Sequence, residues 1–188
     1  MARAPVVVGI TGASGAIFGV RCLLALRRAG LETVAIITRA AQRILELEGP
    51  LPPGEVASLA GECFGEDELD APVASGSFPA RGMIVAPCSI KSLSAIAMSF
   101  NHNLLVRTAD VMLKERRPLV LMVRESPLHL GHIELMARAA RAGAVILPPV
   151  PAFYHAPASV EEVVDQAVGK ALDILGIEHE IFRRWRGK

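Results

Sequence analysis

Small and polar residues gather where the first apolar run of the chain ends. The stretch VVVGITGASGAIFG, from Val6 to Gly19, places glycines three residues apart at Gly9, Gly12 and Gly15. Glycine lets a backbone approach a ligand closely, and a helix that starts here aims its free N–H groups at the same point. We therefore expect this turn to hold a phosphate or another electron-rich group. A plain link between strand and helix is the alternative, because such turns also occur without a ligand.

The same turn lacks the marks of two common nucleotide-binding loops. Its glycines do not follow the Gly-x-Gly-x-x-Gly order, and Thr38-Arg39 ends the second run where a dinucleotide-binding protein has an acidic residue for the ribose. No Gly-Lys-Ser or Gly-Lys-Thr follows, which excludes a P-loop. The only tyrosine, Tyr154, is followed four places later by Ala158 and not by lysine, which disfavours a short-chain dehydrogenase.

Further polar residues follow the third and fourth apolar runs. In VAPCSIKSLSAI, Ser89 and Ser92 stand where hydroxyls cap a helix or bind a ligand. The fourth run ends in VRESP, which puts Arg124 and Glu125 at the rim of the core, where a charge without a partner is costly. Capping or a local salt bridge explains single residues of this set. Polar turns side by side at one sheet edge instead predict a ligand.

Cations recur at positions that one small anion could gather. Arg107 and Lys114 are seven residues apart and fall on one helix face. Together with Arg124 and Lys170, they predict a local cation cluster and therefore a small anionic ligand. For each cation taken singly, a solvated surface position is the alternative.

These turns need a scaffold, and the apolar runs supply it. Short continuous runs suit strands covered on both faces of a parallel sheet: 5–10, 32–38, 82–87, 118–123 and 144–149. Segments of helical period alternate with them: 14–29, 39–48, 89–98, 103–116, 131–142 and 160–175. The alternation predicts an α/β fold, a doubly wound parallel sheet in a Rossmann- or flavodoxin-like three-layer sandwich. Ligands of such sheets bind beyond the carboxyl ends of the strands, where the polar turns fall.

The chain is expected to form one domain over 1–188, with a peripheral segment from about residue 176. Its 188 residues are 52% hydrophobic, which is enough for a substantial core. The segment LPPVPAFYHAPAS, 147–159, contains four prolines around Tyr154. Prolines keep it extended and off the sheet, where it can cover a ligand.

Charge and composition exclude several classes of function. Lys plus Arg number 20 and Asp plus Glu 19, so no large field attracts nucleic acid or a membrane surface. The start, MARAPVVVGITG, fits neither a signal peptide nor a spanning helix, and we expect a cytoplasmic location.

Cysteine and histidine spacing predicts no metal site. The three cysteines are far apart and odd in number, without a Cys-x-x-Cys pair, which also disfavours a disulfide framework. Cys22 and Cys63 are expected to be buried small hydrophobes. His129 and His132 have no third ligand at useful spacing.

Four stretches in order resemble the UbiX/Pad family of flavin prenyltransferases: GITGASGA, APCSIKSLS, VRTADVMLKERRPLVLMVRESPLHLGHIELM and GAVILPPVPAFYHAPAS. The resemblance covers the chain from about Pro5 to Trp185. It implies that dimethylallyl monophosphate prenylates reduced flavin mononucleotide (FMN) at N5 and C6, without a metal. It further implies a homo-dodecamer with the flavin at a subunit junction, and a product that passes to a UbiD-type decarboxylase.

The resemblance also implies roles for individual residues. The positions that match the family's flavin-binding residues are Gly12, Ala13, Ser14, Thr38, Ser89, Ile90, Lys91, Ser92 and Arg107. Those around the prenyl phosphate are Lys114, Arg124, Tyr154 and Lys170, the last replacing an arginine of many relatives. The catalytic positions are Ser14, Glu48 and Glu125. Glu48, Glu125 or the released phosphate could accept the proton lost from the flavin.

Two rival functions stay open at this point. A cysteine-decarboxylating flavoprotein would share the fold, but such proteins use a Pro-Ala-Ser-Ala-Asn-Thr stretch and an active-site histidine, whereas this chain has PCSIKS. A flavin carrier without catalysis is the second rival. It would not need a second group of cations for another anion.

Overall fold

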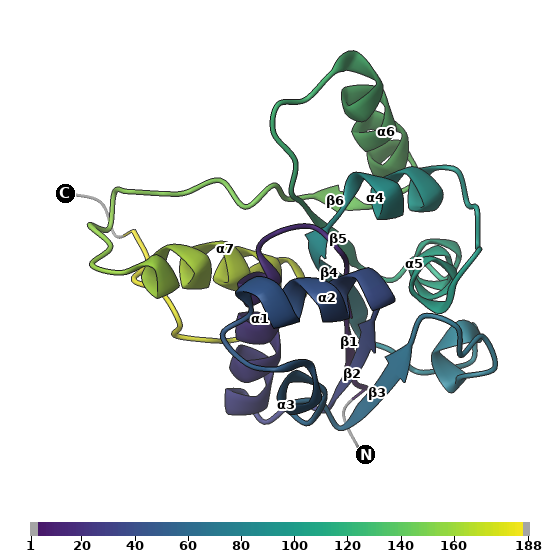
Figure 1. The fold of residues 1–188 in the computed structure, drawn as a ribbon, viewed down its shortest axis with the longest axis horizontal. Coiled ribbons are helices and arrows are strands. Elements are labelled where there is room, and N and C mark those ends of the chain that lie inside the picture. Colours follow the sequence, from purple (N-terminus) through teal and green to yellow (C-terminus); the bar gives the residue numbers. More distant parts are fainter. Residues whose placement is uncertain (1–3, 186–188) are drawn as a thin grey trace.

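The apolar runs of the sequence form the strands of one parallel sheet. The computed structural model describes residues 4–185, and within them the strand order is β3-β2-β1-β4-β5-β6 (Figure 1). The strands are β1 (Val6–Ile10), β2 (Thr33–Ile37), β3 (Glu62–Gly65), β4 (Gly82–Cys88), β5 (Leu119–Val123) and β6 (Val145–Ile146). All neighbouring strands pair in parallel.

Helices cover both faces of this sheet. They are α1 (Ala16–Arg28), α2 (Arg39–Glu48), α3 (Pro53–Ala57), α4 (Ile90–Ala97), α5 (Leu104–Lys114), α6 (Leu130–Arg141) and α7 (Val160–Ile174), with a short 3-10 turn at Pro72–Ala74. One apolar core joins the sheet to α1, α2, α3 and α7, and a second joins it to α4, α5 and α6. The predicted doubly wound, three-layer α/β fold is confirmed.

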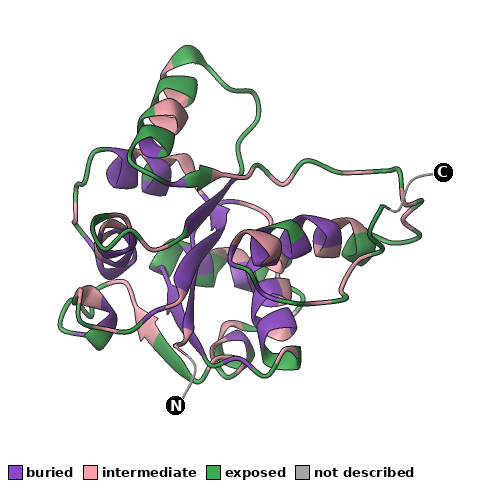
Figure 2. Ribbon diagram, turned by 180° about the vertical axis from the view of Figure 1, so that it is seen from behind, coloured by how far each residue is buried: buried purple, intermediate pink, exposed green. Residues whose placement is uncertain are grey.

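The strand side chains alternate between these two cores. In β1, Val6 and Val8 point to the α1 and α7 side, whereas Val7 points to the α4 and α5 side. All three are fully buried, which explains why the run is apolar at every position. Figure 2 shows the central strands buried, with much of α6 exposed.

The strand order fixes where a ligand would bind. The chain runs outward from β1 through β2 to β3, then returns to β4 beside β1 and runs outward the other way. The connections therefore switch direction between β1 and β4, and the crevice beyond their carboxyl ends is the expected binding place. The turns after these two strands are the two polar turns of the sequence.

Both edges of the sheet differ from the prediction. β3 was not predicted, because ECFG is only four residues long and half-exposed, so it lacks the continuous apolar run of a central strand. At the other edge, the predicted strand 144–149 is only Val145–Ile146. Cys63 lies on β3 and is exposed, so the prediction that it is buried was wrong, whereas Cys22 is buried.

Two segments leave the layered body. Residues 147–159, none of them buried, run as an extended arm from β6 along α7 (Figure 1). Beyond α7, residues 177–185 fold back, and Ile177 is buried. That the whole chain acts as one domain stays a prediction. No helix of residues 4–185 has the length and apolar character needed to cross a membrane.

Candidate functional site

The turn after β1 receives a carboxylate from the chain itself. Ser14 Oγ donates a 2.7 Å hydrogen bond to Oε2 of Glu48, which is the last residue of α2. The N–H groups of Gly15 and Ala16, at the start of α1, both point to Oε1 of the same carboxylate. Free N–H groups were expected here to hold a phosphate, and in this structure Glu48 accepts two of them.

The environment of Glu48 keeps it ionised. Burial acts to raise the pKa of this carboxyl group, but the hydrogen bonds from Ser14, Gly15 and Ala16 and the charge of Arg124 lower the pKa overall. A carboxylate with a lowered pKa is a weak base and a stable negative charge. Glu48 is therefore suited to holding Ser14 in place and to balancing positive charge.

Two glycines of this turn have separate structural reasons. Gly15, which precedes α1, has φ 97°, a left-handed conformation that favours glycine. A Cβ atom at Gly12 would lie 2.4 Å from Cβ of Ala40 in α2. α2 thus approaches Gly12 closely, and this packing is by itself a reason for a glycine at this position.

Thr11 ties the two polar turns together. Its hydroxyl donates to the Pro87 carbonyl oxygen at 2.7 Å and accepts from the Ser89 N–H at 2.8 Å. Because Thr11 is almost completely buried, these bonds fix the turn after β1 against the turn after β4. Thr11 is not among the site residues predicted from the sequence. The available signal was a polar residue directly after a buried strand.

Buried hydroxyls lie at the carboxyl ends of β2 and β4. Thr38 caps α2 by accepting from the Ala41 N–H, at 3.1 Å. Ser89 caps α4 by accepting from the Ser92 N–H, and its own hydroxyl donates to Ser92 Oγ at 3.2 Å. Within residues 4–185, the Thr38 and Ser92 hydroxyls accept hydrogen bonds but donate none, although both residues are buried. Two hydroxyl hydrogens are thus available to a polar ligand such as the ribityl phosphate of FMN.

The other predicted flavin positions lie on the same two turns, with one exception. Ala13 is buried beside Ser14, Ile90 packs partly against the core, and Lys91 is exposed on α4. The exception is Arg107 on α5, whose Nε donates to the Ala74 carbonyl oxygen at 3.0 Å. Within residues 4–185, the Arg107 side chain contacts Ala74 and Asp110 and forms no polar contact with the two turns.

Cys88 lies beside the second turn but is not a nucleophile. Complete burial raises the pKa of its thiol to about 12, so the group stays protonated at neutral pH. Nucleophilic chemistry of cysteine requires the thiolate. The residue is part of the core.

Arg124 and Glu125 follow β5 at the same edge of the sheet. The Arg124 N–H donates to the Cys88 carbonyl oxygen at 3.0 Å, and its charge acts on Glu48. Both side chains are exposed, and among residues 4–185 the Glu125 carboxylate accepts a single hydrogen bond, a local one of 3.0 Å from the Ser126 N–H. These two residues therefore lie at the carboxyl end of β5, at the edge where a ligand is expected.

The predicted cluster of four cations does not form within one chain. Lys114, at the end of α5, pairs with Glu115, and Lys170 on α7 lies 3.8 Å from Asp173. The helices α5 and α7 cover opposite faces of the sheet. Only Arg124 of the four is at the edge that carries Glu48.

Tyr154 and Lys170 lie along one side of α7. Gln166 Nε2 donates to the Tyr154 hydroxyl at 3.3 Å, and Gln166 and Lys170 are neighbours one turn apart on the helix. The end of α7 reaches the amino edge of the sheet, where Arg81 Nε donates to the Leu175 carbonyl oxygen. These two phosphate candidates therefore lie away from the carboxyl-edge turns of the same chain.

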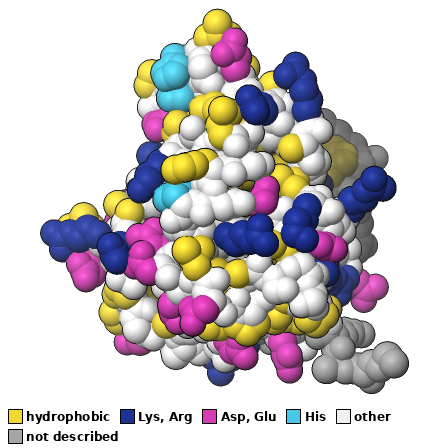
Figure 3. All heavy atoms as spheres, turned by 90° about the vertical axis from the view of Figure 1, so that its right-hand side faces the viewer, with side chains coloured by type: hydrophobic (Ala, Val, Ile, Leu, Met, Phe, Trp, Pro, Cys, Tyr) yellow, Lys and Arg dark blue, Asp and Glu magenta, His cyan; other side chains and the backbone are white. Residues whose placement is uncertain are grey.

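Charged side chains of both signs are mixed on the face of the molecule drawn in Figure 3. This mixture is in keeping with the near-zero net charge. Among residues 4–185, no group of three or more His, Cys, Asp and Glu side chains is arranged to hold a metal ion.

Comparison with known sequences identifies the relatives of this chain. The model of the Flavoprotein family matches residues 1–185. The flavin prenyltransferase UbiX of Thauera aromatica is 51% identical over 182 residues, which cover 97% of this chain and 94% of that protein.

Solved structures agree with this relationship. AnUbiX (PadA1) in complex with FMN and dimethylallyl pyrophosphate has a TM-score of 0.97 at 47% identity, over 99% of each chain. A dodecameric FMN-dependent UbiX-like decarboxylase from Escherichia coli O157:H7 has a TM-score of 0.94 at 43% identity, over 97% of this chain and 100% of that one. The FMN-dependent cysteine decarboxylase TvaF, at 13% identity and a TM-score of 0.68, shares the fold alone. The chain therefore belongs to the UbiX family of flavin prenyltransferases.

Proposed function

We propose that this protein transfers the dimethylallyl group of dimethylallyl monophosphate to N5 and C6 of reduced FMN. The prenylated FMN then serves a UbiD-type decarboxylase. Family membership supports the reaction class, together with a relative whose structure holds FMN and dimethylallyl pyrophosphate. In this chain, the supporting observation is the pair of buried hydroxyls, Thr38 and Ser92, with unused donors beyond the carboxyl ends of β2 and β4.

The two carboxyl-edge turns would hold the flavin. Thr38 and Ser92 donate to its phosphate-bearing tail, while Gly12 and Ala13 present backbone to it. Reduced FMN, when bound, supplies nucleophilic positions at N5 and C6. Ser14 stays oriented by Glu48 on the same side of the crevice.

Fixed donors would stabilise the departing phosphate. Breaking the allylic C–O bond concentrates negative charge on the phosphate, and Tyr154, Lys170, Lys114 and Arg124 supply a hydroxyl and three cations. Lys170 stands where many relatives have arginine. Its ammonium group is a point charge and not a planar guanidinium, so it binds phosphate with a different geometry. Removal of one such donor costs about 2.7–4 kcal/mol of barrier in comparable oxyanion sites.

A proton must leave the flavin for the second bond to form. Glu48, Glu125 and the leaving phosphate are the possible acceptors. Glu48 is ionised, but three donors already occupy its carboxylate. Glu125 is exposed and accepts one local hydrogen bond, which leaves more of its capacity for a proton.

The site would be completed by neighbouring copies of the chain. Arg107 and Lys114 lie on α5, and Tyr154 and Lys170 lie along α7, on the opposite face of the sheet from α5. A homo-dodecamer, the state named for the E. coli relative, brings such faces together at subunit junctions. We further propose that the reaction needs no metal and takes place in the cytoplasm.

One anaerobic experiment tests the reaction. The protein is incubated with reduced FMN and either dimethylallyl monophosphate or dimethylallyl pyrophosphate. Each incubation is done with and without a metal chelator, and the mass of the extracted flavin is then measured by mass spectrometry. We expect a gain of one five-carbon unit with the monophosphate, unchanged by the chelator. An unchanged flavin mass with intact donor would remove the prenyltransferase proposal in favour of a carrier. Loss of carbon dioxide from a peptide ending in cysteine would support the other rival.

A further inference from the structure

The C-terminal segment, residues 177–185, has a defined position on α7. Gly176 adopts a positive φ of 62° directly after the helix, and the chain then turns back. A Cβ atom at Gly169 would lie 2.3 Å from Cδ1 of Phe182, so the Phe182 ring packs on the helix backbone. His179 Nε2 lies 2.9 Å from the Gly169 carbonyl oxygen. The segment thus depends on a glycine in the middle of α7.

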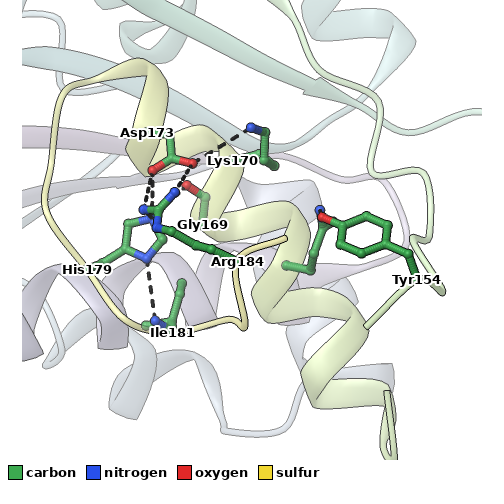
Figure 4. Close-up of polar contacts among 8 residues, drawn as sticks. Tyr154, Gly169, Lys170, Asp173, His179, Ile181 and Arg184 are labelled. Atoms are coloured by element: carbon green, nitrogen blue, oxygen red, sulfur yellow. Dashed lines mark hydrogen bonds and ion pairs between the residues drawn. The ribbon is translucent and has the colours of Figure 1, made fainter. Parts of the chain in front are cut away.

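Asp173 connects this segment to Lys170. Arg184 donates two hydrogen bonds to its carboxylate, at 3.0 Å and 2.7 Å. His179 Nε2 lies 3.2 Å from Oδ1, and Lys170 Nζ lies 3.8 Å from Oδ2 (Figure 4). The hydrogen bonds from Arg184 are the main cause that lowers the pKa of Asp173, which therefore stays charged at neutral pH.

The charge of this group suits an anionic ligand. Lys170 and Arg184 carry one positive charge each and Asp173 one negative charge, so a net charge of +1 is left when His179 is neutral. Asp173 thus holds two cations in place without cancelling their attraction for a phosphate. A bidentate pair with arginine also fixes geometry better than a single contact does.

The same contacts place Trp185 beside Tyr154. Trp185 follows Arg184, and its ring meets the Tyr154 ring edge-on, with centroids 5.8 Å apart and planes at 80°. Tyr154, Phe182, Arg184 and Trp185 help to line a cavity of about 610 Å³, within the usual range for small ligands. Neither Lys170 nor Asp173 lines this cavity, but Asp173 joins Lys170 to Arg184 and His179, which do.

We propose that Asp173 is a positioning residue for prenyl phosphate binding. It orients Lys170 directly, and through Arg184 and His179 it holds the C-terminal segment that closes against Tyr154. This inference rests on the proposed function, because Tyr154 and Lys170 are assigned there to the phosphate of the donor.

Two variants of the full chain test this role by different routes. Asp173→Asn keeps the shape of the side chain but removes its charge. Gly169→Ala displaces Phe182 and His179 without changing any charge. For both, we expect KM for dimethylallyl monophosphate to rise about tenfold, with kcat reduced less and FMN affinity unchanged. Asp173→Glu should recover part of the affinity, since it restores the carboxylate.

A matched control lies on the same helix. Asp165, also on α7, accepts a bidentate pair of hydrogen bonds from Arg21. Asp165→Asn therefore also breaks an arginine–carboxylate pair of α7, but one that does not involve the C-terminal segment. We expect it to lower thermal stability and leave KM unchanged. Trp185 is the only tryptophan in the chain, so acrylamide quenching of its fluorescence reports directly on the segment. Quenching should rise in Asp173→Asn and Gly169→Ala alone.

Direct binding of the donor, measured by calorimetry, separates this inference from the reaction itself. If the wild type forms no prenylated flavin, the proposed function fails, and the role of Asp173 is still decided by donor binding and by Trp185 quenching. Looser Trp185 with unchanged donor affinity would reduce Asp173 to a structural contact. Wild-type quenching and wild-type KM in both variants would overturn the inference entirely.

Discussion

Two regions of the molecule form the proposed site, and they differ in how far contacts within one chain fix the positions of their residues. The edge region comprises the turn 11–16, Glu48 and the turn 87–92, and hydrogen bonds between elements far apart in sequence connect its parts. The α7 region comprises Tyr154, Lys170 and the C-terminal segment. There Tyr154 is 52% exposed and Trp185 60% exposed, whereas Thr11 in the edge region is 1% exposed.

This difference teaches which half of the site one chain prepares. In the edge region, buried hydroxyls must find partners, because a buried polar group without one costs about 1–3 kcal/mol. The turns are therefore fixed before a ligand arrives. In the α7 region, the cations Lys170 and Arg184 are about half exposed, and ion pairs of such exposed cations contribute little in water. That region is completed only when another surface covers it, which is what a subunit junction provides.

The largest expected effect comes from breaking the edge region at Glu48. Glu48→Gln removes the charge that three donors and Arg124 keep in place, and the amide nitrogen that replaces one oxygen cannot accept the hydrogen bonds made to that oxygen. We expect turnover to fall about 10²–10³-fold, the range for loss of one preorganised electrostatic group, with FMN still bound. Single-turnover kinetics with bound reduced FMN measures this.

Glu46→Gln is the matched control for that change. Glu46 lies on the same helix and pairs with Arg43 on the exposed surface, so its loss should leave turnover unchanged. Wild-type turnover in Glu48→Gln would end the catalytic role of Glu48. Glu125 and the leaving phosphate would then be the only proton acceptors of the proposal.

A second prediction concerns whether the edge region and the α7 region of one site come from different subunits. Glu48→Gln disables the edge region and Lys170→Ala the α7 region, so each homo-oligomer should be nearly inactive. Suppose that one site takes Glu48 from one chain and Lys170 from another. When the two variants co-assemble at random in equal amounts, each of these residues is intact at roughly half of the sites, so both are intact at roughly a quarter. Activity of co-expressed, differently tagged variants checks this.

The double variant co-assembled with wild type distinguishes the two arrangements. A shared site again gives roughly a quarter of wild-type activity, whereas a site within one chain gives roughly half. If the site lies within one chain, the mixture of Glu48→Gln and Lys170→Ala chains stays inactive. That result would contradict the division of the site between chains and would require Lys170 to reach Glu48 along its own subunit.

What the sequence reveals about this molecule follows the same division. Continuous apolar runs predict β1, β2, β4 and β5, and the polar turns after β1 and β4 point to the switch point, since both signals are local. β3 has no such run, and the link from Thr11 to Ser89 joins residues 78 positions apart, so neither is visible in a local pattern. The contacts of Asp173 depend on how a C-terminal segment folds back on α7, which spacing does not determine.

The smallest effect probes why Gly12 is a glycine. In Gly12→Ala, the new Cβ would lie 2.4 Å from Cβ of Ala40, and neither α2 nor the turn can yield easily. We expect the free energy of unfolding to fall by about 1–3 kcal/mol, as for other overpacked sites. Gly54→Ala is the control, because nothing lies within 4 Å of its new Cβ and alanine favours the helix by up to about 1 kcal/mol.

Denaturant titrations at equal protomer concentration, together with FMN affinities, decide between two reasons for this glycine. If α2 sets the requirement, stability falls in Gly12→Ala and FMN affinity falls with it, because Thr38 and Glu48 at the two ends of α2 both move. If the flavin alone sets it, affinity falls while stability stays at the wild-type value. The first result would mean that packing between the turn after β1 and α2 prepares the edge region before any flavin binds. The second would mean that the flavin itself shapes the turn, and the contrast with the α7 region would then disappear.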